Sequence, residues 1–135
     1  MNIELREDHD PDQEAVVALY KANHWSSAEK PEQLYQALLH SHSLVTAWAG
    51  AQLVGLGNAL SDGYLVVYYP HLLVHPDYQG KGIGKMIMDR LCRKYGHIHQ
   101  QILVSDSKTT SFYQKCGFVP AGSTQTMWIY QGNEH

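Results

Sequence analysis

A glycine-rich loop between an apolar strand and a helix constrains this chain more than any other feature. It lies within the run Leu72 to Lys85, which reads L-L-V-H-P-D-Y-Q-G-K-G-I-G-K. Its glycines, at positions 80, 82 and 84, let the backbone approach a ligand closely, because no Cβ stands in the way. The first N–H groups of the following helix lack intrahelical partners and lie at the positive end of its dipole. The loop therefore predicts an anion site, above all one for phosphate.

The spacing of these glycines excludes two common phosphate-binding loops. A Walker A loop requires G-x-x-x-x-G-K followed by Ser or Thr. Counting back from Gly84-Lys85 places Gln79 at the first glycine, and Met86 stands where the hydroxyl residue belongs. The dinucleotide fingerprint requires G-x-G-x-x-G near the first strand of a βαβ unit, whereas these glycines read G-x-G-x-G beyond mid-chain. An ordinary glycine-rich turn before a helix is the structural alternative.

Two motifs resemble those of the GNAT superfamily of N-acetyltransferases. The segment Gln79 to Gly84 matches its acetyl-CoA signature, which is Arg or Gln, two variable residues, Gly, one variable residue, and Gly or Ala. About thirty residues later, Ser111 to Phe118 is similar to the second motif of the superfamily, F-Y-x-x-x-G-F. The specific part of the resemblance covers residues 64–119.

The resemblance implies an α+β fold, a central and mostly antiparallel twisted sheet with a splayed fourth strand, flanked by helices. A chain of 135 residues suits one domain, so residues 1–135 are expected to form a single GNAT domain.

The residue pattern predicts helices and strands in the same order as that fold. Strands are expected at 2–7, 43–49, 52–61, 64–75, 101–105, 118–119 and 126–130, and helices from Asp10-Pro11, from Pro31, after Gly82 and over Thr109 to Cys116. The apolar spacing of the first three helices predicts which residues they bury: Val16, Leu19 and Tyr20, then Leu34 and Leu38, then a wide stripe from Ile83 to Tyr95.

Composition narrows the class of protein. A net charge of −3 argues against a general nucleic-acid binder, which would carry a basic patch. No apolar stretch reaches the ~18 residues of a membrane span, and the polar start is not that of a signal peptide. The two cysteines show no metal spacing and indicate reduced thiols of a cytoplasmic protein. The sequence leaves monomer and homodimer open.

Acetylation of an amine needs a proton acceptor for the amine and an acid for the departing CoA thiolate. The resemblance places Tyr113 near the CoA sulfur, which makes its phenol the candidate acid; packing of the short helix is the structural alternative.

The expected fourth strand contains no Asp or Glu, although many GNAT members carry one there. His71 lies near that position, and a neutral imidazole can accept a proton at pH 7, directly or through water. Its structural alternative is a histidine satisfied by a backbone carbonyl within the sheet.

Pro70 indicates where the sheet opens, because a proline cannot donate to a strand ladder and marks an edge or a bulge. The superfamily has a bulge in this strand, which admits the pantetheine arm of CoA. The resemblance implies that backbone groups of the next strand pair with pantetheine, that the N–H of Leu73 serves as an oxyanion donor, and that the loop holds the pyrophosphate. The predicted cofactor-binding residues are Leu72, Leu73, Val74, Gln79, Gly80, Lys81, Gly82, Ile83, Gly84 and Lys85.

Aromatic residues dominate the expected acceptor pocket: Trp25, Tyr64, Tyr68 and Tyr69, with Trp128 as a further wall. Such a lining favours a small primary amine with an apolar or aryl part, held by cation–π contact. Protein N-termini, lysine side chains, polyamines and amino sugars stay open as acceptors.

Nine histidines raise the question of a metal site. The pairs His40/His42 and His97/His99 lack the spacing that places two ligands on one face of a helix, so no metal site is expected.

The predicted function is therefore transfer of acetyl from acetyl-CoA to a primary amine, by direct attack in a ternary complex, without a metal. A non-catalytic acyl-CoA sensor or regulatory subunit is the alternative from another class. A structural domain with a vestigial loop is a third interpretation.

Overall fold

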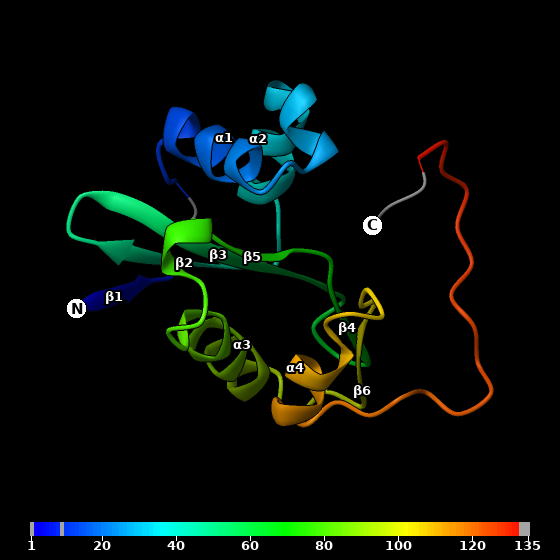
Figure 1. Cartoon of the computed structure of the whole chain (residues 1–135). Coiled ribbons are helices and arrows are strands. Elements are labelled where there is room, and N and C mark those ends of the chain that lie inside the picture. Colours follow the sequence, from blue (N-terminus) through cyan, green and yellow to red (C-terminus); the bar gives the residue numbers. More distant parts are fainter. Residues whose placement is uncertain (1, 9, 133–135) are drawn as a thin grey trace. The chain divides into compact units, whose positions relative to one another are not determined.

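The computed structural model describes residues 2–8 and 10–132. Their regular elements, drawn in Figure 1, follow one another along the chain as β1 (Ile3–Arg6), α1 (Gln13–Ala22), η1 (Ser26–Glu29), α2 (Pro31–Leu39), β2 (Ser43–Ala49), β3 (Gln52–Ser61), β4 (Val66–Tyr69), β5 (Leu72–Val74), η2 (Pro76–Tyr78), α3 (Ile83–Lys94), β6 (Gln100–Leu103) and α4 (Thr110–Lys115). The chain divides into two compact units, Met1–Ile102 and Leu103–His135.

The first unit is built on a sheet in the order β1-β2-β3-β4-β6, with β5 also paired to β3. The pairings of β1 through β5 are all antiparallel. Helices α1 and α2 lie on one face of the sheet and α3 lies on the other (Figure 1). The predicted mixed fold with a mostly antiparallel sheet and flanking helices is confirmed. Within the described part of the chain, no helix is long and apolar enough to cross a bilayer.

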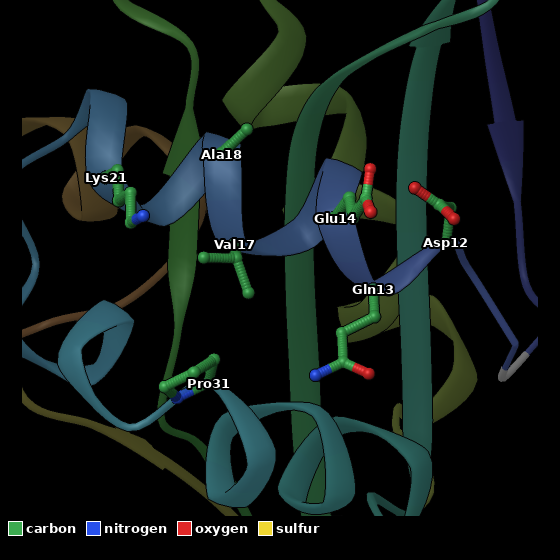
Figure 2. Close-up of a pocket in the computed structure, with 7 residues that line it drawn as sticks. All are labelled: Asp12, Gln13, Glu14, Val17, Ala18, Lys21 and Pro31. Atoms are coloured by element: carbon green, nitrogen blue, oxygen red, sulfur yellow. The ribbon is translucent and has the colours of Figure 1, made fainter.

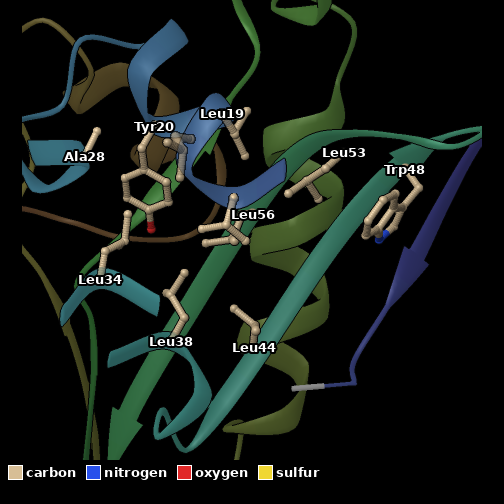
Figure 3. Packing of buried hydrophobic residues seen from close by; sticks show 11 residues of the cluster. Leu19, Tyr20, Ala28, Leu34, Leu38, Leu44, Trp48, Leu53 and Leu56 are labelled. Atoms are coloured by element: carbon tan, nitrogen blue, oxygen red, sulfur yellow. The ribbon is translucent and has the colours of Figure 1, made fainter. Parts of the chain in front are cut away.

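The core follows the apolar stripes that the sequence predicts. In α1 the buried side chains are Val16, Leu19 and Tyr20, and in α2 they are Leu34 and Leu38. They pack against inward-facing residues of the sheet, as Figure 3 shows for Leu44 and Leu56. On the opposite face, α3 buries Ile83, Ile87, Met88 and Leu91.

Helix α1 begins two residues later than predicted. Asp12, not Asp10, is its N-cap, and the Asp12 carboxylate accepts the N–H of Ala15 at 3.0 Å. The sequence offers two aspartates that flank Pro11, and the capping geometry selects the second.

The strand predicted over residues 64–75 is two strands, and one extra residue lies between them. Gly57 pairs with Leu72, and Leu60 pairs with Tyr68. Three steps along β3 therefore oppose four steps from β4 to β5, which defines a β-bulge at Pro70-His71. The bulge expected from Pro70 is present.

The strands predicted at 118–119 and 126–130 are wrong. The second unit contains α4, and its described residues beyond Gly117 form no helix or strand. Alternating apolar residues do favour an extended backbone, but a strand also needs a hydrogen-bonded neighbour. Those described residues have no such ladder.

Candidate functional site: the glycine loop and a half-buried imidazole

The predicted anion site is built from backbone groups at the start of α3. Gly80 and Gly82 have φ values of 78° and 86°, in the left-handed region that favours glycine. Gly82 is the N-cap of α3 and makes no side-chain capping bond. The first helical hydrogen bond runs from the Met86 N–H to the Gly82 carbonyl, 3.1 Å away. The N–H groups just before Met86 thus belong to the first turn, where a helix attracts anions.

Side chains around this loop make structural contacts. The Gln79 amide donates to the Val74 carbonyl at 3.0 Å and to the Asn23 side chain at 3.3 Å. Lys85 pairs with Asp89, with 2.8 Å between Nζ and the carboxylate oxygen. The neighbouring lysine at position 81 is exposed. The loop therefore offers an anion mainly backbone donors, and Gln79 ties it to the C-terminal end of α1.

The register of β5 shows which of its backbone groups face away from β3. His75 donates its N–H to the Val54 carbonyl at 2.8 Å, and the His71 carbonyl accepts the N–H of Asn58 at 3.2 Å. The backbone N–H and carbonyl groups of every second residue in a strand point toward the same neighbouring strand. Leu73, which lies between His71 and His75 in this alternation, therefore also points its N–H toward β3. This corrects the assignment of Leu73 as the outward oxyanion donor. The backbone groups of the two residues that flank Leu73 point away from β3.

The bulge decides the direction of His71. Before it, Tyr69 faces the α3 side of the sheet, where its ring lies 6.1 Å from that of Tyr95. After it, Leu73 packs on the opposite face, in the cluster that includes Tyr20. A shift of one residue exchanges the faces of a strand. The side chain of His71, two residues before Leu73, therefore lies on the same face of the sheet as α1.

Contacts with Tyr20, Asn58 and Trp25 hold His71 there. Its Nδ1 lies 2.7 Å from the Tyr20 hydroxyl, and its backbone N–H donates to the Asn58 side chain at 3.0 Å. The Trp25 ring meets the imidazole edge-on, with 5.1 Å between centroids. Trp25 follows His24, a non-glycine residue with a φ of 59°. Such strained backbone needs support from its surroundings and is enriched at functional sites.

The electrostatics beside His71 are those of a polar network within an apolar core. Tyr20 is fully buried, and this burial raises the pKa of its phenol far above the ordinary value of about 10. The Tyr20 hydroxyl therefore stays protonated at every physiological pH. Asn58, which is 3% exposed, extends the polar contacts by donating to the Ser41 hydroxyl at 3.0 Å.

Two of the predicted aromatic residues lie on the same side of the sheet as His71. Trp25 adjoins the imidazole directly. Tyr68 lies on the face of β4 opposite to that of Tyr69, hence on the His71 side. This side of the sheet therefore carries the aromatic character that the sequence predicts for an acceptor pocket.

The other predicted aromatic residues lie elsewhere. Tyr69 is buried in the core, and its hydroxyl donates to the Gln101 side chain at 2.6 Å. Tyr64 is 83% exposed in the turn between β3 and β4. The predicted wall Trp128 belongs to the second unit and is 51% exposed. Tyr69 is thus a structural residue of the first unit and not a wall of the His71 site.

Tyr113, the predicted acid, lies in α4 of the second unit. Its ring packs edge-on against Phe112 and Phe118, with centroids 5.0 Å and 6.2 Å away. Burial, and to a lesser extent the nearby Cys116, raises the pKa of the Tyr113 phenol to about 12. The phenol therefore keeps its proton at neutral pH, as an acid must before it acts.

Sequence reasoning does not identify Tyr20 and Asn58 as site residues. The apolar stripe of α1 predicts only that Tyr20 is buried, and it is. Its contact with His71 joins residues 51 positions apart, and the Asn58 contact spans 13. The one sequence signal that bears on them is Pro70, which marks the bulge without naming the partners.

A separate pocket of about 630 Å³ lies along α1 and contains none of the predicted site residues. Figure 2 shows its lining, which is Asp12, Gln13, Glu14, Val17, Ala18, Lys21 and Pro31. The Asp12 carboxylate in this lining is already engaged in capping α1. That carboxylate therefore serves the helix itself.

The curated proteins to which this chain is similar include N-acetyltransferases. The uncharacterized N-acetyltransferase ycf52 of Porphyra purpurea is 31% identical over 100 residues, which cover 68% of this chain and 58% of that protein. The chloroplastic GCN5-related N-acetyltransferase 2 of Arabidopsis thaliana is 35% identical over 81 residues, which cover 57% of this chain and 31% of that protein. This chain spans 44–58% of the length of three ycf52 proteins that it matches.

Solved structures give the same fold. A GNAT-family acetyltransferase from Streptococcus pneumoniae TIGR4 has a TM-score of 0.84 at 30% identity, covering 97% of this chain and 100% of that one. An aminoglycoside N-acetyltransferase in complex with CoA has a TM-score of 0.72 at 15% identity, covering 97% of this chain and 95% of that one. The Acetyltransferase (GNAT) domain family matches residues 7–128. By its motifs, its fold and this match, the chain belongs to the GNAT family of acetyltransferases.

Proposed function

We propose that this protein transfers the acetyl group of acetyl-CoA to a primary amine. The observation that carries the proposal is the glycine loop, whose left-handed Gly80 and Gly82 open α3 with backbone donors. The loop follows closely on β5, where the backbone N–H and carbonyl of Leu72 and the N–H of Val74 point away from β3. Anion donors beside strand-like amide partners suit the pyrophosphate and pantetheine parts of CoA. The fold shared with a CoA-bound acetyltransferase supports this choice of cofactor.

The acceptor end of the site is proposed at His71. The half-buried Trp25 and the side of β4 that carries Tyr68 give this end an aromatic character. We propose a small amine with an apolar part as the acceptor. A protein N-terminus or a lysine side chain is the alternative, because the aromatic surface suits any cation with an alkyl stem.

In the proposed reaction the neutral amine attacks the thioester carbonyl carbon directly. The C–N bond forms, the C–S bond breaks, and the CoA thiolate leaves with the bonding electron pair. Tyr113 donates its proton to that thiolate, consistent with a phenol whose pKa is raised to about 12. His71 contacts the amine end, and its part in the reaction depends on which ring nitrogen carries the proton.

Binding and turnover are tested separately. Acetyl-CoA at 100 times its Kd should stabilise the fold by ~2.7 kcal/mol, and free CoA should act similarly while ATP does little. Tyr113→Phe should keep this thermal shift and lower kcat about 100-fold or more, the scale of a lost general acid. Tyr35→Phe, which removes a hydroxyl bonded to the Pro11 carbonyl, is the matched control and should leave kcat unchanged.

Two outcomes would overturn the proposal. Stabilisation by acetyl-CoA without release of free CoA thiol with any amine would indicate the acyl-CoA sensor. No stabilisation at millimolar acetyl-CoA would remove both the enzyme and the sensor. A cytoplasmic location of the protein stays a prediction; the Arabidopsis relative is a chloroplastic protein.

A further inference from the structure

The hydrogen bond between Tyr20 and His71 has a direction that the surrounding residues determine. The Tyr20 hydroxyl lies 2.7 Å from His71 Nδ1, and Tyr20 is fully buried. Among the described residues, the hydroxyl has no other hydrogen-bond partner. If Nδ1 donated to it, the hydroxyl proton would be buried without an acceptor. The hydroxyl therefore donates and Nδ1 accepts.

The position of the protons on His71 follows from this direction. A neutral imidazole carries one proton, so a ring that accepts at Nδ1 carries it on Nε2. Turning the ring over would place a carbon against the Tyr20 hydroxyl and lose the bond. The Asn58 side chain holds the His71 backbone, and the Trp25 ring packs against the imidazole. The same contacts thus fix the ring and its tautomer.

We propose that Tyr20 is a positioning residue that fixes His71 as the Nε2–H tautomer, so that His71 donates a hydrogen bond to bound substrate instead of deprotonating the amine. The second part rests on the proposed function. The acceptor then binds after losing its proton to water, and His71 orients the reacting groups. An Nε2 that already carries a proton has no lone pair with which to take another.

The tautomer can be measured without any turnover. Long-range ¹H–¹⁵N correlation spectra of the wild-type protein at about pH 8, above the ordinary pKa of ~6.5 for His, distinguish the two ring nitrogens. We expect His71 to be protonated on Nε2. Tyr20→Phe should shift the ring toward the other tautomer, whereas Tyr35→Phe should not. A wild-type ring protonated on Nδ1 would overturn the proposal, whether or not the Tyr20 variant folds.

Two substitutions of His71 then test its role in the reaction. His71→Gln keeps an amide donor near the reach of Nε2 but offers no base, whereas His71→Ala offers neither. We expect kcat/KM to fall about 100-fold in His71→Ala, the scale of one lost preorganised donor, and less than about tenfold in His71→Gln. Equal losses in both variants would show that His71 acts as the base. Absence of turnover in the wild type would contradict the proposed function but leave the tautomer measurement intact.

Discussion

Asn58 is the residue on which the position of His71 depends most directly. Its side chain accepts the His71 N–H at 3.0 Å and donates to the Ser41 hydroxyl at 3.0 Å. Its backbone N–H donates to the His71 carbonyl. The Asn58 side chain therefore supplies the acceptor that the His71 N–H lacks in the ladder at the bulge, because backbone polar groups inside the fold require partners.

Asn58→Ala should lower the free energy of unfolding by about 1–3 kcal/mol, because it removes the acceptor of the His71 N–H and one donor to the Ser41 hydroxyl. Chemical denaturation measures this change. Gln36→Ala, on the exposed side of α2, is the control and should change stability by less than about 0.5 kcal/mol. An Asn58 variant as stable as the control would show that water replaces the amide.

At the scale of elements, the close approach of α3 to β3 sets the thickness of the first unit. A Cβ on Gly57 would lie 2.7 Å from Ile87 Cγ2 and 3.2 Å from Leu91 Cδ1. Gly55, on the same face of β3, is similarly close to Ile87. The glycines that would weaken an isolated strand thus allow the helix to pack on it.

Gly57→Ala should destabilise the protein by about 1–3 kcal/mol, because Ile87 must move from a packed position. The midpoint of urea unfolding would report it. Gly96→Ala is the matched control, since its Cβ would meet nothing nearer than the Arg93 carbonyl at 3.7 Å. Equal midpoints for the two variants would mean that α3 moves away from the sheet with little loss of stability.

An ion-pair group joins the end of β1 to α3. The Glu7 carboxylate lies 2.8 Å from Arg90 and 2.9 Å from Lys94, and hydrogen bonds from Lys94 and then Arg90 lower its pKa. A lowered folded-state pKa gives stability that is present above the unfolded value of 4.5 and is lost as pH falls through the folded value. Because the side chains are partly exposed, the contribution is at most about 1 kcal/mol.

Glu7→Gln should therefore lower the free energy of unfolding by up to about 1 kcal/mol at pH 7. The difference from wild type should disappear at acid pH, where the carboxylate is protonated, and shrink at high salt, where the pairs are screened. Glu29→Gln on η1 serves as the control. A difference that persists at low pH would indicate a packing effect.

At the scale of the whole molecule, the chain combines a closely packed first unit with a second unit that exposes apolar side chains. Met127 and Ile129 are 90% and 106% exposed, and Val119 is 80% exposed. The segment that carries them has no helix or strand among its described residues. An extended backbone without a ladder should open to a protease before the sheet does.

Limited digestion with chymotrypsin should first cut at Trp128 or Tyr130 and leave residues 2–102 intact. Tyr64, although 83% exposed, should be cut more slowly, because Asp62 accepts the N–H groups of Tyr64 and of the two residues that follow it. Mass spectrometry of early time points identifies the order. Protection at Trp128 and Tyr130 would show that another surface covers this segment in solution.

The glycine loop and the buried faces of α1, α2 and α3 could be predicted from the sequence, because each is a local property of residue type and spacing. Pro70 indicated an edge or a bulge, and the family resemblance favoured the bulge that the strand register shows. The sequence could not determine the last strands, since a strand requires a partner that its own pattern does not name. The surroundings of His71 depend on how the chain folds. The bulge turns that side chain to the α1 face, where folding brings Tyr20 to it from 51 residues away. A residue's type supplies its chemistry, but its proton position depends on the neighbours that packing places beside it.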